Sequence, residues 1–148
     1  MSLDSYVENA WLKKEAASPQ EITDQLGIVA RCMKDASVEG ISDDLRFYTT
    51  FNALLALANT ALRASGYRTT NQQGHHMRTI ETLEYTIHAD SKTIRKILAF
   101  SKKRNIASYD AAGSISNEEL KQILVTAESL QDAVQTWLTA THPELLTP

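Results

Sequence analysis

The residue types best suited to phosphate chemistry stand together at Lys103-Arg104-Asn105, with four residues between Arg104 and Tyr109. A guanidinium can hold a phosphate through two parallel hydrogen bonds, and an ammonium or an amide can add further contacts. A phenol has an ordinary pKa of about 10, so at neutral pH it donates a hydrogen bond rather than accepting a proton. The pattern predicts phosphate binding by Arg104, Asn105 and Lys103, with Tyr109 as an additional donor.

Charge around this segment differs from charge in the rest of the chain. Six cations and no carboxylate lie between Ser91 and Tyr109, whereas the remaining residues hold nine cations and eighteen carboxylates. A basic patch on an acidic protein attracts a polyanion locally. The net charge of −3 argues against long, non-specific binding to duplex nucleic acid.

The adjacent residues His75 and His76 are the second candidates for chemistry. An imidazole exchanges a proton near neutral pH, so either residue can serve as an acid–base partner. This hypothesis requires the loop before them to fold towards Arg104; the alternative is a surface location near a helix start. The sequence has no metal-binding spacing, P-loop, nucleophile elbow or dinucleotide-binding pattern, so no metal and no cofactor are predicted.

Capping residues and apolar positions at helical spacing predict the elements that must position these groups. The helices are expected from about Leu3 to Ala16, Ser18 to Gly40, Ser42 to Gly66, His75 through Ile87, Asp90 or Ser91 to Asn105, and Ser116 to Pro143. No strand is predicted, and residues 67–74 are expected to form a polar loop. The fold class is all-α: an antiparallel up-and-down bundle of four main helices with shorter extra helices.

The 148 residues fit one domain, 1–148, with a core over roughly 18–142. The hydrophobic fraction of 43% and charged fraction of 22% are typical of globular proteins. No apolar run is long enough for a membrane span, and no signal peptide is visible, so a cytoplasmic protein without membrane contact is expected. The single cysteine, Cys32, fits a reducing compartment.

Several short segments carry a family resemblance in the same order along the chain. They are Phe51-Asn52-Ala53-Leu54, Gly66-Tyr67-Arg68, Gly74-His75-His76, Ile80-Glu81-Thr82-Leu83, the Arg104-Asn105 segment up to Tyr109, Trp137-Leu138 and His142-Pro143-Glu144-Leu145. Together they resemble a bacterial branch of the HEPN superfamily, the higher eukaryotes and prokaryotes nucleotide-binding domain. The resemblance covers residues from about Phe47 to Leu145.

The resemblance implies a HEPN-like domain that forms a homodimer and binds RNA or a nucleotide phosphate in a toxin–antitoxin or phage-defence system. In ribonucleases of this family an Arg holds the phosphate, and a His that follows after four to six intervening residues handles the proton. Here Tyr109 stands at the position of that His. The implied catalytic residues of a metal-independent RNase are Arg104 and Tyr109, with His75 or His76 as substitutes for the missing imidazole.

Two other interpretations remain open from sequence. Lys102, Lys103 and Arg104 at a helix carboxyl end complement the helix dipole, and Asn105 is a suitable left-handed terminator, so the segment can be purely structural. The chain can also be a non-catalytic dimeric helical module that binds a partner protein, such as a nucleotidyltransferase antitoxin.

Overall fold

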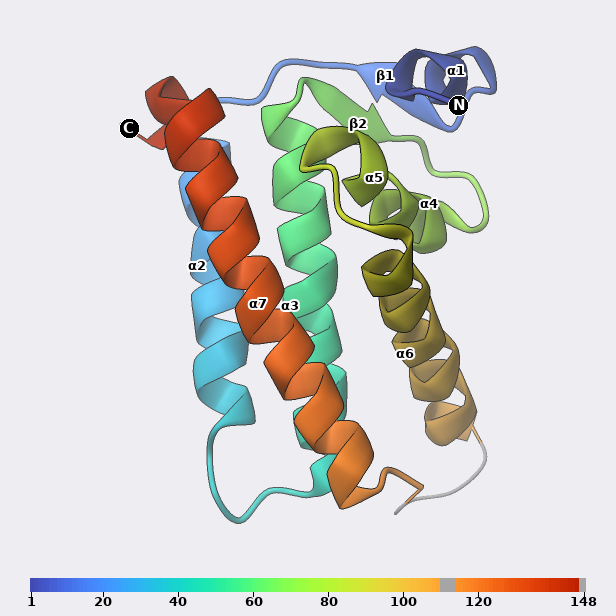
Figure 1. Cartoon of the computed structure of the whole chain (residues 1–148), viewed down its shortest axis with the longest axis vertical. Coiled ribbons are helices and arrows are strands. Elements are labelled where there is room, and N and C mark those ends of the chain that lie inside the picture. The colour runs from blue at the N-terminus through green and yellow to red at the C-terminus, as the bar shows by residue number, and fades with distance from the viewer. Residues whose placement is uncertain (110–113, 147–148) are drawn as a thin grey trace.

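The computed structural model describes residues 1–109 and 114–146. Most of these residues are helical, which agrees with the predicted all-α class. The long helices are α2 (Pro19–Ala36), α3 (Asp43–Ala64), α6 (Ser91–Tyr109) and α7 (Asn117–Thr141). They alternate in direction along the long axis of the molecule, as Figure 1 shows. Shorter helices are α1 (Leu3–Glu8), α4 (His75–Glu81), α5 (Leu83–Thr86) and the 3-10 helix η1 (Pro143–Leu146).

Serine side chains fix the starts of three long helices. Ser18, Ser42 and Ser116 each accept a hydrogen bond from the backbone N–H three residues later, at 3.1 Å. Each bond satisfies an amide that has no partner inside the helix. Asp90 accepts the N–H of Thr93 at 2.7 Å in the same way before α6. These predicted helix starts are confirmed.

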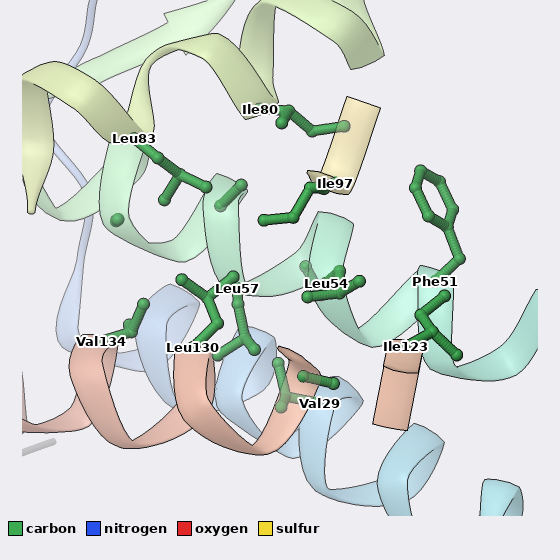
Figure 2. Packing of buried hydrophobic residues seen from close by; sticks show 14 of the residues in the cluster. Val29, Phe51, Leu54, Leu57, Ile80, Leu83, Ile97, Ile123, Leu130 and Val134 are labelled. Atoms are coloured by element: carbon green, nitrogen blue, oxygen red, sulfur yellow. The ribbon is translucent and has the colours of Figure 1, made fainter. Parts of the chain in front are cut away.

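Helix α3 forms the centre of the fold. It contacts α2, α4, α5, α6, α7 and β2, and its buried residues include Phe47, Phe51, Leu54 and Leu57. Figure 2 shows side chains from α2, α4, α5, α6 and α7 around this helix. The labelled ones outside α3 are Val29, Ile80, Leu83, Ile97, Ile123, Leu130 and Val134. Burial of large side chains on several faces explains why α3 is apolar around most of its circumference.

The amino-terminal helix is shorter than predicted, and a small sheet replaces its second half. Helix α1 ends at Glu8, and Ala10 takes a left-handed conformation with φ of 61°. Strand β1 (Leu12–Lys14) then pairs antiparallel with β2 (Tyr67–Thr69), with Leu12 opposite Thr69. The predictions of one helix to Ala16, of no strand and of a loop from residue 67 were therefore wrong. Three-residue strands are too short to show an alternating pattern.

The fourth predicted helix is interrupted at Thr82. This residue is fully buried, and its hydroxyl donates to the carbonyl of Thr79 at 2.6 Å. The chain forms α4 and α5 instead of one helix, and Met77 on α4 is 54% exposed.

Helix α6 continues beyond the predicted end. Arg104 and Asn105 are helical, and the helix ends at Tyr109. Asn105 is therefore not a left-handed terminator, and that part of the purely structural interpretation was wrong. In the described parts of the chain, no helix combines the length and apolar character needed to cross a membrane.

Candidate functional site

A cavity of about 350 Å³ opens between α2, α3, β2 and α4. Its walls carry amides, imidazoles and hydroxyls around a small apolar floor, and no carboxylate is among the lining residues. These are Gln25, Asn52, Leu55, Ala56, Asn59, Thr69, His75, His76 and Thr79. The chemistry of the walls suits a polar ligand that needs hydrogen bonds in several directions.

One face of α3 supplies the floor and one wall of this cavity. Asn52, Leu55, Ala56 and Asn59 recur at three- and four-residue spacing, so they lie on the same side of the helix. The amide of Asn59 donates to the side-chain oxygen of Gln25 on α2 at 3.3 Å. This contact fixes the orientation of both amides at one end of the cavity.

The two histidines form the opposite wall. Their rings meet edge to face with centroids 4.2 Å apart, and Nδ1 of His75 lies 3.3 Å from the carbonyl oxygen of Gln72. The turn before them depends on Gly74, whose φ of +82° is a conformation that side-chain-bearing residues rarely adopt. The local backbone therefore brings both imidazoles to the cavity at the start of α4.

Arg104 approaches the same region from α6. Its guanidinium carbon lies 5.5 Å from the ring centroid of Phe51, the residue before Asn52 on α3. Partial burial, then His75, then the positive charge of Arg104 lower the pKa of His76 below the ordinary value of 6.5. His76, at the start of α4, therefore lies within electrostatic range of Arg104.

The other predicted phosphate ligands lie in different surroundings. The ammonium of Lys103 is 3.3 Å from a carboxylate oxygen of Glu119 on α7, and Asn105 is exposed. Tyr109 is the last residue of α6, and its side chain lies outside the described part of the structure. Position 109 is five positions after 104 on the helix, so the two lie about 140° apart around the helix axis. The structure therefore associates Arg104 with His76 rather than with Lys103 or Asn105.

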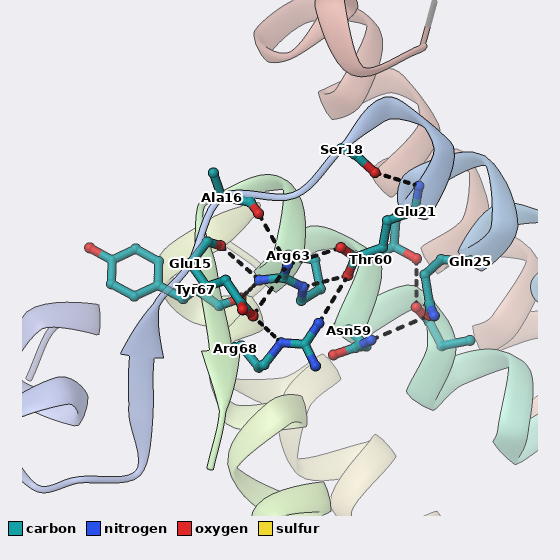
Figure 3. A network of polar contacts seen from close by, with 11 residues as sticks. Glu15, Ala16, Ser18, Glu21, Gln25, Asn59, Thr60, Arg63, Tyr67 and Arg68 are labelled. Atoms are coloured by element: carbon teal, nitrogen blue, oxygen red, sulfur yellow. Dashed lines mark hydrogen bonds and ion pairs between the residues drawn. The ribbon is translucent and has the colours of Figure 1, made fainter. Parts of the chain in front are cut away.

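Sequence reasoning missed a buried arginine one helical turn from the Asn59 wall of the cavity. Arg63, only 2% exposed, donates from Nε to Glu21 at 2.6 Å and from Nη2 to the other carboxylate oxygen at 3.0 Å. Its Nη1 donates to the carbonyls of Glu15 and Tyr67 at 2.8 and 3.0 Å. Figure 3 shows this network beside the Gln25–Asn59 contact, with Arg68 on its outer side.

The amides of the cavity were also missed, although the sequence contains a signal for them. Asn52 and Asn59 are seven residues apart on the most apolar helix, so they form a polar stripe two turns long. A polar stripe on an otherwise apolar helix indicates a face of that helix that other helices do not cover. The arginine network offers no such signal, because Arg63 and Glu21 are 42 residues apart.

A scan against protein-family models found no match, and searches of curated proteins and of solved structures found none either. Within residues 1–109 and 114–146, no three histidine, cysteine or acidic side chains cluster closely enough to hold a metal ion. The case for a function therefore depends on the cavity and its charges.

Proposed function

We propose that this chain is a HEPN-like antiparallel helical bundle that binds single-stranded RNA or a nucleotide phosphate where Arg104 and His76 approach each other. The observation that supports the proposal is the convergence of both histidines, from the start of α4, with an arginine from α6 beside the amide-lined cavity. An arginine stacked on an aromatic ring keeps its donors directed while the ring shields one face.

The lowered pKa of His76 favours the neutral imidazole, which is the form that a general base requires. A neutral imidazole at pH 7 can accept the proton of a ribose 2′-hydroxyl, and the same group can donate after it is protonated. Arg104 would then stabilise the negative charge that grows on the phosphate oxygens. RNA cleavage at an altered site is therefore the catalytic form of the proposal, with His76 in the role that Tyr109 is poorly suited to fill.

The binding test compares two arginines of equal charge. Fluorescence anisotropy with a labelled single-stranded RNA at low salt should show binding by the wild type and a loss of at least about tenfold in Arg104→Ala. Arg31→Ala removes the same charge from an exposed position on α2 and should change affinity by less than about threefold. Equal losses in both variants would refute a specific site at Arg104.

The cleavage test uses the histidines. If the protein cuts the same RNA, His76→Ala should remove cleavage while leaving most of the binding, since Arg104 is retained. Cleavage that survives in both His75→Ala and His76→Ala would exclude the imidazoles as acid–base groups. Binding without any cleavage would leave a phosphate-binding protein as the function.

The proposal includes a homodimer and a protein partner of the antitoxin type. Met77, half exposed directly after the two histidines, favours a protein contact beside the site. Light scattering on the purified protein should give about twice the chain mass, and Met77→Lys should lower that mass. A monomer at all concentrations would contradict the dimer without affecting the RNA-binding test.

A further inference from the structure

A second cavity, of about 220 Å³, lies between α1, the junction of α4 and α5, and the first turns of α6. This is the end of the molecule where α1 and the sheet lie over α4 and α5 (Figure 1). Tyr6, Tyr85, Glu81 and Glu84 line it together with the apolar residues Ile94 and Leu98. It shares no lining residue with the cavity described above.

Two tyrosine rings form a fixed corner of this cavity. The rings of Tyr6 and Tyr85 have centroids 5.8 Å apart and planes inclined by 66°. Trp11 also packs edge to face against Tyr6, with ring centroids 5.2 Å apart. The corner therefore exists before any ligand binds.

The hydroxyl of Tyr6 has no partner within the described structure. Tyr6 is 5% exposed, yet its hydroxyl makes no hydrogen bond to the described residues. It is also not among the fully enclosed polar atoms without a partner in the described residues, so the oxygen keeps some exposure, and Tyr6 lines this cavity. A buried tyrosine normally has its hydroxyl bonded, so this one is available to a ligand.

Glu81 places a carboxylate in the same space, and Arg78 acts on it from beyond ion-pair distance. The side chain is half-buried and makes no hydrogen bond or ion pair with the described residues, and burial raises its pKa despite the charge of Arg78. Arg78 itself stacks over Trp11 at 4.5 Å and donates to the carbonyl of Gln73 at 3.0 Å.

Arg95 contributes to the wall of this cavity but does not neutralise it. Two carboxylates, those of Glu81 and Glu84, line the cavity together with this one guanidinium. The cavity therefore has a surplus of negative charge and acceptors.

We propose that this cavity binds the primary ammonium group of an alkyl amine. The three N–H donors of an ammonium match the carboxylate of Glu81, the hydroxyl oxygen of Tyr6 and the carboxylate of Glu84, while the tyrosine faces add a cation–π attraction. The methylene chain of the amine packs on Ile94 and Leu98. A quaternary ammonium has the same charge but no donor, so it should bind more weakly.

The ammonium has two sources, a free diamine or a lysine side chain, and the probes separate them. Calorimetry on the full chain at low salt would use putrescine, N-acetyl-lysine amide and choline. We expect a dissociation constant below about 1 mM for one of the two primary amines. Choline should bind at least about fivefold more weakly than that amine. The tighter of the two primary amines identifies the source, and no binding of either would overturn the proposal.

Variants test the two groups on which the proposal depends. Glu81→Gln keeps the shape and should weaken amine binding at least tenfold, whereas Glu128→Gln, an exposed residue of α7, should leave it unchanged. Tyr6→Phe should weaken binding of the primary amine and not of choline. Circular dichroism checks that each variant folds. An equal loss of amine affinity in Glu81→Gln and Glu128→Gln would overturn the proposal. If Tyr6→Phe does not fold, Glu81→Gln alone decides the question.

Discussion

Arg63 and Glu21 form a bidentate ion pair, with contacts of 2.6 and 3.0 Å, between the end of α3 and the start of α2. One turn before Arg63 on α3, Asn59 donates to Gln25, which lies one turn after Glu21 on α2. The two contacts are successive polar links between antiparallel helices, and the second forms one end of the amide-lined cavity. The pair therefore fixes the register of α2 against α3 and, through it, the position of the cavity wall.

Removal of the buried guanidinium should destabilise the protein strongly. Arg63→Met leaves the Glu21 carboxylate and the carbonyls of Glu15 and Tyr67 without their donor. We expect the free energy of unfolding to fall by about 3 kcal/mol in urea titrations. Arg68→Met removes the outer arginine, whose side chain is 46% exposed, and should cost less than about 1 kcal/mol. Similar losses in the two variants would show that Arg63 has no special role.

The same pair should make stability depend on pH in the acid range. The hydrogen bond from Arg63, which outweighs partial burial, holds the pKa of Glu21 below its ordinary value of 4.5. A carboxyl group whose pKa is lowered by folding stabilises the protein fully above its unfolded pKa, and this contribution is lost as pH falls through the lower folded value. Urea titrations from pH 7 to pH 3 should show a steeper loss in the wild type than in Glu21→Gln. Parallel curves would contradict the linkage.

The charge of Arg104 should be measurable at His76. Burial is the largest cause of the lowered pKa of His76, so Arg104→Ala should raise this pKa only part of the way towards 6.5. A nuclear magnetic resonance titration of the imidazole signals measures the change, and Arg31→Ala is the control of equal charge. Bound phosphate should raise the pKa of His76 in the wild type, because an anion favours the imidazolium. An unchanged pKa in Arg104→Ala would place the guanidinium too far away to act on the site.

Two glycines provide a matched test of the turn that presents the histidines. Gly74 has a φ of +82°, so Gly74→Ala should destabilise the protein by about 1 kcal/mol and lower RNA affinity. Gly27 lies inside α2 with nothing within 4 Å of an added Cβ, so Gly27→Ala should raise stability by about 0.5–1 kcal/mol. Thermal unfolding and the anisotropy assay measure both effects. A neutral Gly74→Ala would mean that the turn does not need its left-handed conformation.

Features that depend on a few neighbouring residues were predictable from the sequence. Ser18, Ser42 and Ser116 define helix starts because each side chain bonds an amide only three residues away. The central position of α3 follows from its apolar residues on several faces, and the all-α class follows from the same periodicity. The basic segment at Arg104 was also visible, because its composition is local.

Features that depend on distant partners were decided only by the tertiary structure. Strand β1 forms because Leu12 and its neighbours meet β2 more than fifty residues later, and α6 extends past Asn105 although that residue often ends helices. His76 and Arg104 belong to different helices, and they approach because α4 and α6 both pack against α3. The sequence alone determined which side chains have suitable chemistry. Only long-range packing decided which of them lie near one another, since contacts between distant segments leave no local pattern.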